Sequence, residues 1–341
     1  MVINMQRIGK YVLKLSGQTR VAGSAGVGAK TEGEGPLRDD FDFLFPDDGI
    51  GQSTWEKAES ELQKKAVTLA VENAGKTVNE IDCIFAGDLL NQCTGATFGI
   101  RDMNIPFIGM YGACSTMVLS LATASVFVDS GAAQTAVAST SSHFCSAEKQ
   151  FRFPLEYGGQ RTPTAQRTAT AAGAAVLEYG KPDGIIINKV MFGKIVDKGI
   201  TDPNNMGAAM APAAARTIAD FLTDTGTKPE EYDLILTGDL GYVGTQLLYE
   251  LLQTKENIDI SAVHNDCGLM IFDREKQDVH AGGSGCGCCA SVLCSHIFKR
   301  MKKGELKRIL VVATGALLSP VTSMQNESIP GIAHAVEIVY R

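Results

Sequence analysis

The sequence predicts an α/β protein of two similar halves, with helices and sheets stacked in five layers. The first observation behind this prediction is an internal repeat: residues 75–89 read GKTVNEIDCIFAGDL, and residues 226–240 read GTKPEEYDLILTGDL. Five positions are identical without a gap, at a constant spacing of 151 residues: Gly75, Asp82, Gly87, Asp88 and Leu89 match Gly226, Asp233, Gly238, Asp239 and Leu240. A repeat of this kind indicates a duplicated structural unit.

The second observation is that helix and strand patterns alternate in the same order around both copies. Ser53 and Glu56 form a predicted capping box for the helix before the first copy, which is expected to end at Gly75. The helix before the second copy is expected to run from about Pro212 to Gly226. The expected strands are Ile84–Ala86, Ile105–Tyr111 and Ala136–Ser139 in the first half, and Leu234–Thr237, Ile258–Val263 and Ile309–Ala313 in the second. The further helices are expected at Thr94–Met103, Ser115–Asp129, Gly244–Thr254 and Cys286–Lys302.

Strands that alternate with helices favour parallel pairing, and two copies favour two halves related by a pseudo-twofold axis. We therefore expect an N-terminal half of residues 1–180 and a C-terminal half of residues 181–341, joined near Gly180–Gly184. The segment through Asp48 is expected to be an irregular surface extension, and residues 139–167 a long loop.

The third observation is that the third helix of each half is almost free of charge. The first reads STMVLSLATASVFVD and has no charged residue before Asp129. A helix that is apolar on every side is buried on every side. Two such helices between two sheets give the order α/β/α/β/α.

Composition excludes several classes of protein. The 341 residues are 45% hydrophobic and 20% charged, which is typical of a folded globular chain, and the net charge of −7 argues against a general nucleic-acid binder. Neither a signal peptide, a lipid-anchor motif nor an apolar run long enough to span a membrane is evident. The nine cysteines are an odd number and are expected to be reduced thiols.

Several strings resemble the thiolase superfamily over nearly the whole chain. They are the duplicated half, the GACST string of Gly112–Thr116, the His264–Gly268 turn and the glycine-rich Gly282–Gly287 segment. Longer strings resemble one sporulation branch of that superfamily: GDLLNQ, TSSH, EYGGQ, GITD, HNDCGLMI, AGGSGC and VVATGALLSP. The resemblance implies a thiolase fold and a soluble component of the SpoVA machinery, which transports dipicolinic acid in endospore-forming bacteria.

The resemblance also implies the ligand and the partners. The ligand would be pyridine-2,6-dicarboxylate, alone or as its Ca²⁺ chelate, taken up into the developing spore and released in germination. The partners would be membrane-embedded SpoVA proteins and a second copy of the chain as a homodimer. The chain would then be a cytoplasmic-type protein of the sporulating cell, attached peripherally to the inner spore membrane through those partners.

Cys114 is the first candidate site residue. It lies just before the predicted buried helix, where free backbone N–H groups and the helix dipole stabilise an anion and lower a thiol pKa. In condensing relatives the matching cysteine is acylated. Three interpretations stay open: a pocket wall that holds a carboxylate, a nucleophile, and a small buried residue at a tight turn.

The resemblance places the other candidates on the opposite wall of the same pocket. They are His264, Asp266, Cys267, Gly283 and Ser284, with His143 as a further candidate. His264 matches a histidine that assists the chemistry of condensing relatives. Asp266 would repel a dicarboxylate unless it were protonated or bridged by a cation such as Ca²⁺.

One departure from the superfamily argues against an enzyme. Several condensing relatives carry a catalytic Asn or His in the glycine-rich segment, whereas residues 282–286 read GGSGC. Claisen chemistry needs a second polar group beside the nucleophile, so Cys114 and His264 alone predict a degenerate site. Cys286, Cys288, Cys289 and Cys294 lack the spacing of a zinc knuckle and are expected to be buried thiols.

The 139–167 segment also contains Arg152, Arg161 and Arg167 near Tyr157, donors that suit a dianion but are equally at home on a solvated loop. Three functions therefore remain to be weighed. They are a dipicolinic acid binding protein without a cofactor or metal of its own, an acyl transferase or condensing enzyme that uses Cys114, and a scaffold without a ligand.

Overall fold

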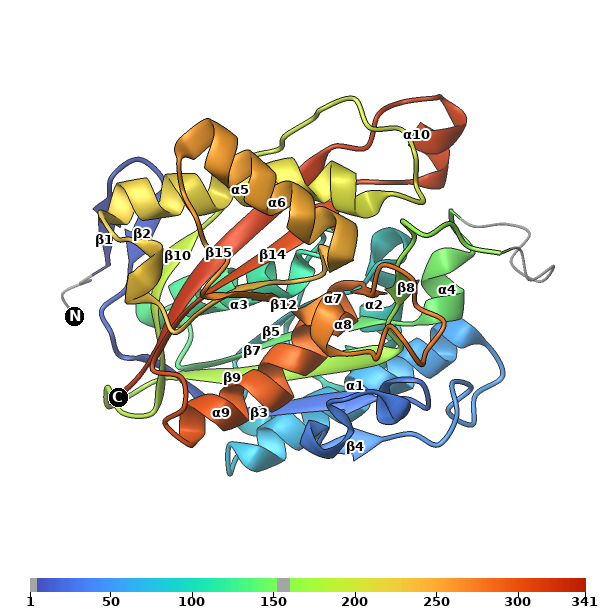
Figure 1. Cartoon of the computed structure of the whole chain (residues 1–341). Coiled ribbons are helices and arrows are strands. Elements are labelled where there is room, and N and C mark those ends of the chain that lie inside the picture. The colour runs from blue at the N-terminus through green and yellow to red at the C-terminus, as the bar shows by residue number, and fades with distance from the viewer. Residues whose placement is uncertain (1–4, 152–159) are drawn as a thin grey trace.

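The fold is a mixed sheet whose two halves repeat one strand order. A computed structural model describes residues 5–151 and 160–341 (Figure 1). Across the N-terminal half-sheet the strands are β3 (Thr19–Gly28), β9 (Ala171–Tyr179), β7 (Thr135–Ser142), β5 (Cys83–Gly87) and β6 (Phe107–Gly109). Across the C-terminal half-sheet they are β10 (Ile185–Met191), β15 (Gly331–Tyr340), β14 (Arg308–Ala316), β11 (Leu234–Thr237) and β12 (His264–Asp266). The half-sheets meet where β3 pairs with β10, at Arg20 and Ile186.

Strand direction follows the same pattern in both halves. The last three strands of each series are parallel, as predicted from the alternation of strands and helices. The second strand of each series, β9 or β15, is antiparallel to both of its neighbours. The sequence patterns missed the first two strands of each half, which are long, almost wholly buried and rich in small or branched residues.

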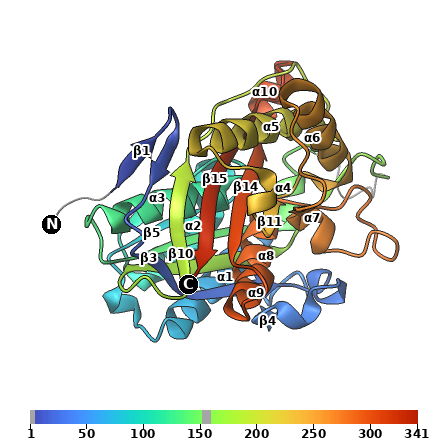
Figure 2. The same ribbon diagram turned by 60° about the vertical axis from the view of Figure 1, so that its left-hand side comes forward.

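Helices form the outer and middle layers. They are α1 (Trp55–Asn73) and α2 (Thr94–Ile100) on one face, and α5 (Met206–Thr225) and α6 (Gly241–Glu256) on the other. The middle helices are α3 (Thr116–Asp129) and α8 (Cys286–Val292), which continues through a π-turn at Leu293–Ile297 into α9 (Phe298–Lys302). Helix α3 contacts β5 and β7 on one side and β14 and β15 on the other. Figures 1 and 2 both show α3 and α8 between α1 and the α5–α6 pair, so the duplicated five-layer fold is confirmed.

The N-terminal segment corrects the expectation of an irregular surface extension. It contains β1 (Gln6–Ile8), β2 (Val12–Lys14), which pairs with β10, the central strand β3, and β4 (Phe43–Leu44). The glycines of β3 hid it, because they are unfavourable in strands. They are needed for close packing: a Cβ on Gly23 would lie 2.3 Å from the backbone nitrogen of Ala74, and one on Gly26 would lie 2.6 Å from the carbonyl oxygen of Ser291.

Two predicted helix starts were wrong. Helix α1 is capped by Thr54, whose hydroxyl accepts a hydrogen bond from the Lys57 N–H, and not by a Ser53–Glu56 box. Helix α5 begins at Met206, capped by Asn205, so Pro212 lies inside it. Both predicted ends hold, since Gly75 and Gly226 have φ of +66° and +65°, the left-handed conformation that terminates a helix.

The predicted strand Ile258–Val263 was also wrong, and the candidate residue His264 lies within the strand instead of after it. The Asp259 carboxylate accepts from the Ser261 N–H, and Val263 N–H donates to the Ile260 carbonyl, so these residues form turns. The strand is β12, which begins at His264 instead of ending before it.

Short elements complete the described chain. They are α4 (Phe144–Glu148), β8 (Arg167–Thr168), α7 (Cys267–Met270), β13 (Gly283–Ser284), α10 (Pro320–Met324) and the 3₁₀ turns Glu32–Glu34, Arg38–Asp40, Val78–Glu80, Asn91–Cys93, Arg101–Met103 and Pro229–Glu231. Strands β8 and β13 pair as a separate two-stranded sheet beside the start of α8. In the described ranges no helix combines the length and apolar composition of a membrane span.

Candidate functional site

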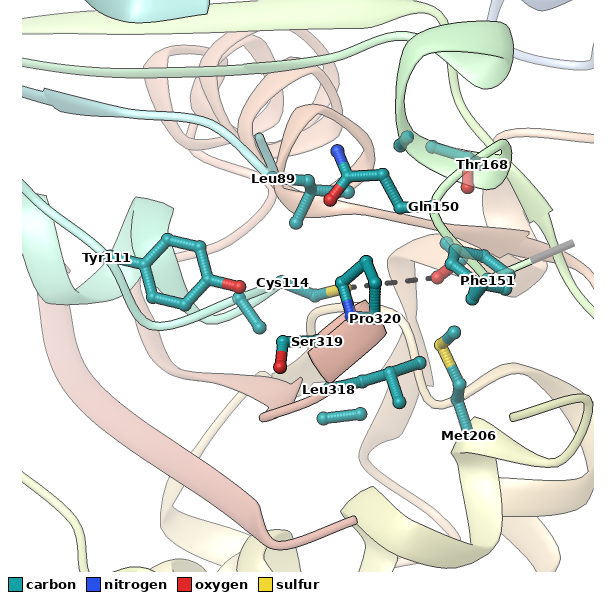
Figure 3. Close-up of a pocket in the computed structure, with 14 residues that line it drawn as sticks. Leu89, Tyr111, Cys114, Gln150, Phe151, Thr168, Met206, Leu318, Ser319 and Pro320 are labelled. Carbon is teal, nitrogen blue, oxygen red and sulfur yellow. Dashed lines mark hydrogen bonds between the residues drawn. The ribbon is translucent and has the colours of Figure 1, made fainter. Parts of the chain in front are cut away.

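A small cavity lies where the two halves meet, at the start of the middle helix α3. Its volume is about 50 Å³, room for about four water molecules. Fourteen described residues line it, and Figure 3 shows Cys114 among them: Leu89, Tyr111, Ala113, Cys114, Ala147, Gln150, Phe151, Thr168, Met206, Ser284, Ala316, Leu318, Ser319 and Pro320. These residues are apolar or neutral polar, and none of them carries a charge at neutral pH.

A tight turn presents Cys114 to the cavity. Ala113 has φ of +51°, a left-handed conformation that an alanine adopts only when its surroundings impose it. Ser115 holds the turn, because both its N–H and its hydroxyl donate to the Gly112 carbonyl. Strand β14 presses against the turn at Gly315, where a Cβ would lie 2.2 Å from the Gly112 oxygen. The thiol is thereby fixed one residue before Ser115, the N-cap of α3.

Ser284 and Asp239 come from the other half and meet Cys114. The Ser284 hydroxyl lies 3.9 Å from the Cys114 sulfur and donates to Oδ2 of Asp239 at 3.1 Å. The Gly285 N–H donates to the same oxygen at 2.8 Å, and the Thr314 hydroxyl donates to Oδ1 at 3.2 Å. Asp239 is fully buried and accepts from the same Ser284 hydroxyl that contacts the Cys114 sulfur, so it lies directly behind the cavity wall.

Sequence reasoning missed Asp239 as a site residue. It is the middle residue of the Gly-Asp-Leu string that identified the repeat, and it follows the carboxyl end of β11, where functional residues collect in α/β folds. That repeated string was the signal that could have selected it.

Electrostatics at the site oppose a reactive thiolate. Burial raises the pKa of the Cys114 thiol well above its ordinary value, and the neighbouring Asp239 carboxyl raises it further. Burial also raises the pKa of Asp239 to about 6. The expectation that the α3 dipole lowers the Cys114 pKa is therefore wrong, since burial and an adjacent acid outweigh the helix terminus.

The structure separates His264, Asp266 and Cys267 from this cavity. His264 bonds through Nε2 to the Thr237 hydroxyl at 3.0 Å and through Nδ1 to the Tyr249 hydroxyl at 2.9 Å, and burial lowers its pKa to about 4. Cys267 is wholly buried in the apolar core. Neither these two residues nor Asp266 belong to the described cavity lining.

Asp266 is bonded at the start of helix α6. Its carboxyl accepts from the Thr237 hydroxyl at 2.6 Å, the Leu240 N–H at 2.8 Å and the Gly241 N–H at 3.0 Å. Burial raises its pKa to about 7. Since both oxygens already accept hydrogen bonds from the protein, this geometry gives no support to a calcium bridge at Asp266.

The remaining candidates also differ in position. Ser284 lines the cavity, whereas Gly283 contributes a carbonyl that accepts from Gln166 at 2.7 Å. His143 is buried, bonds the Asp48 carbonyl at 2.7 Å and accepts from the Cys145 N–H, so it caps α4 outside the lining.

The arginines of the 139–167 segment do not reach the cavity lining where they are described. Arg161 pairs with Asp278 at 2.8 Å, and Arg167 lies over the Phe144 ring at 4.0 Å. Arg152 and Tyr157 lie outside the described residues. The predicted loop is also shorter than 139–167, because β7 extends to Ser142 and α4 follows it.

Cys286, Cys288 and Cys289 on α8 and Cys294 in the π-turn are buried thiols, as expected, and none of the nine cysteines forms a disulfide. Among the described residues, no group of three or more His, Cys, Asp or Glu side chains is placed to hold a metal ion.

Comparison with known proteins identifies relatives of the whole chain. The sequence profile of the stage V sporulation protein AD (SpoVAD) family matches residues 9–339. Stage V sporulation protein AD of Bacillus subtilis (strain 168) is 48% identical over 314 residues, which is 92% of each chain.

Solved structures show the fold at low identity. Crystalline 3-oxoacyl-(acyl-carrier-protein) synthase III from Aquifex aeolicus has a TM-score of 0.58 at 15% identity, covering 94% of this chain and 100% of its own. A variant of OleA from Xanthomonas campestris has a TM-score of 0.59 at 15% identity, covering 96% and 99%. Both are thiolase-fold proteins.

Proposed function

The chain belongs to the stage V sporulation protein AD family, and from this premise we propose that its cavity at Cys114 binds dipicolinic acid as the neutral calcium chelate. The observation that carries the proposal is the character of the cavity. It is small, it is walled by neutral polar and apolar side chains, and it lies at the N-terminus of a buried helix.

The charge of the ligand decides between its two forms. Free pyridine-2,6-dicarboxylate is a dianion at neutral pH, whereas its calcium chelate has no net charge. A buried dianion needs positive partners. The described lining supplies none, and the buried Asp239 behind it is an acid. The neutral chelate avoids this cost, while Tyr111, Ser319 and Thr168 offer hydroxyls around its edge.

Calorimetric titration tests the proposal. Dipicolinic acid with Ca²⁺ should bind saturably and more tightly than the free acid. Cys114→Ala and Ser284→Ala should each weaken binding about five- to tenfold, the worth of one hydrogen bond. Cys294→Ala is the matched control, because Cys294 is equally buried but outside the lining. Absence of binding of either form by the folded wild type would refute the proposal.

Acyl transfer through Cys114 is the second candidate, favoured by the position of the thiol at the start of α3. The raised pKa of Cys114 and the Asp239 carboxyl beside it oppose it, because the nucleophile is the thiolate. A mass increase on Cys114 after incubation with acyl-CoA would support acyl transfer and displace the binding role.

The partners follow from the same proposal. The chain would pass its ligand to membrane-embedded SpoVA proteins, which would also hold it at the inner spore membrane during uptake and germination. A homodimer would form at β6, the outermost strand of the N-terminal half-sheet, which carries the half-exposed Phe107 and has Phe98 and Tyr111 nearby in sequence. An unpaired edge strand with exposed aromatic residues favours pairing with a second copy.

A further inference from the structure

We propose that Asp239 determines which hydrogen-bonding groups the cavity wall offers to a ligand, and that binding of the free dicarboxylate is coupled to uptake of one proton by Asp239. The inference deepens the proposed function and rests on it for the identity of the ligand. The dependence of the wall's hydrogen-bonding groups on the Asp239 proton does not require a ligand.

The contacts of Asp239 define the first state of the wall. Ser284, Thr314 and the Gly285 N–H all donate to its two oxygens, and the Cys114 sulfur lies 3.9 Å from the Ser284 oxygen. A hydroxyl or thiol has only one hydrogen to donate. With Asp239 ionised, the Ser284 hydrogen is directed at the carboxylate and the Cys114 hydrogen at the Ser284 oxygen, so the two groups turn only lone pairs towards the cavity.

Protonation reverses one of these bonds. A proton taken from solvent onto Asp239 must itself be donated, and the Ser284 oxygen lies 3.1 Å away to accept it. The hydroxyl hydrogen of Ser284 is then free to turn towards the cavity. One proton taken up behind the wall therefore becomes one hydrogen-bond donor on its surface, without any covalent step.

The surroundings of Asp239 make its proton responsive to a bound anion. The ionisable groups that face it from the neighbouring elements are Cys114 before α3, Asp266 on β12, and Cys286 and Cys288 on α8. All are acids, and no described cation offsets them. Full burial raises the pKa of Asp239 to about 6, so a carboxylate arriving on the other side of Cys114 and Ser284 raises it further towards neutrality.

The two forms of the ligand should therefore behave differently. The free dicarboxylate needs donors and should bind with uptake of about one proton above pH 6. The calcium chelate is neutral, and water bound to its metal can donate to the lone pairs of the wall. It should bind with no proton uptake. Asp239 thus gives the cavity a pH-dependent preference between the free dicarboxylate and its calcium chelate.

Calorimetry in buffers of different ionisation enthalpy measures the proton uptake directly. For wild type and free dipicolinic acid we expect about one proton, and an affinity that falls about tenfold for each pH unit above pH 7. Asp239→Asn should abolish both effects, because its amide keeps the wall in the donor state. Asp88→Asn is the matched control: Asp88 is the repeat counterpart of Asp239, is fully buried and has a pKa raised to about 6, but does not line the cavity.

A second measurement needs no ligand. The S–H stretching band of Cys114, isolated as the infrared difference between wild type and Cys114→Ala, should shift as Asp239 ionises between about pH 5 and pH 8. It should not shift in Asp239→Asn. An S–H band that does not shift with pH overturns the inference, even if the ligand binds. Equal proton uptake by wild type and Asp239→Asn also overturns it. Failure of both ligand forms to bind, with a band that shifts, refutes the proposed function alone.

Discussion

The position of Cys114 depends on a single missing methyl group on the neighbouring strand, and Gly315→Ala is the sharpest test of that dependence. In the structure, an added Cβ at Gly315 would lie 2.2 Å from the Gly112 oxygen and 3.2 Å from both the Ala113 Cβ and the Ser115 nitrogen. Carbon and oxygen pack at about 3.3 Å or more. The turn must therefore move by about 1 Å, and the obstacle is backbone, which cannot rotate out of the way.

The magnitude follows from that displacement. Overpacking of a close contact costs about 1–3 kcal/mol of folding free energy. A movement of about 1 Å also disturbs the 3.9 Å contact of the Cys114 sulfur with the Ser284 oxygen, so ligand binding should weaken about tenfold, the worth of one hydrogen bond. Urea unfolding measures the loss of folding free energy, and calorimetric titration of the calcium chelate measures the loss of affinity.

Gly180→Ala is the control for the general effect of replacing a glycine. Its added Cβ would meet only the guanidinium end of Arg20, at 3.3 Å, and that side chain can move. Gly180→Ala should leave both measurements within about 0.5 kcal/mol of wild type. If Gly315→Ala changes the folding free energy and the ligand affinity as little as Gly180→Ala does, β14 does not hold the Cys114 turn.

Three further predictions follow from buried acids and the sheet edge. Asp266→Ala should lower the free energy of unfolding by about 2–3 kcal/mol, because the Thr237 hydroxyl and the Leu240 and Gly241 N–H groups lose their buried acceptor. Urea unfolding measures this loss, and a midpoint equal to that of the wild type would contradict it. Burial raises the pKa of Glu59 to about 8 and that of Glu32 to about 7. Each therefore binds its proton more tightly in the folded state, so the free energy of unfolding should fall as the pH rises from about 5 to 8. The fall should be less steep in Glu59→Gln, and urea midpoints that rise over this interval would contradict the prediction. Phe107→Lys should convert a dimer into a monomer in light scattering, and an unchanged mass would remove β6 from the interface.

The repeat carried most of what the sequence predicted about the fold. Strand β11 has the bounds Leu234–Thr237 expected from the repeat, and β5 extends its predicted counterpart by one residue at each end. The absence of charge in α3 predicted its place between the two sheets. These features are local, since a residue's own polarity and spacing decide them.

What the sequence patterns missed depends on contacts between distant segments. Strand β3 contains glycines where α1 and α8 approach its backbone, and no pattern within residues 19–28 reveals those neighbours. His264 was aligned with a catalytic histidine, but its ring bonds Thr237 and Tyr249, which follow from the pairing of β12 with β11 and the position of α6. Whether His264, Asp266, Cys267, Gly283 or His143 contributes to ligand binding stays a prediction.

The two copies of the Gly-Asp-Leu string explain how one half came to supply a site residue. In the N-terminal copy, Asp88 accepts hydrogen bonds from the Leu90 and Ala96 N–H groups, so its carboxyl is used in holding the start of its own helix. The C-terminal counterpart of the Leu90 N–H is that of Gly241, and its acceptor is Asp266.

Asp266 therefore performs, from β12, the capping role that the repeat would otherwise assign to Asp239. Because Asp266 takes this role, the Asp239 carboxyl is not needed at α6 and is free to accept from Ser284, Gly285 and Thr314. Removing Asp266 should accordingly do more than destabilise α6. It leaves the Gly241 N–H without its acceptor, and Asp239 is the acid that the repeat predisposes to replace it. A double variant, Asp266→Ala with Asp239→Asn, should therefore be less stable than the sum of the two single changes, and strict additivity in urea unfolding would show that the two acids do not share this role.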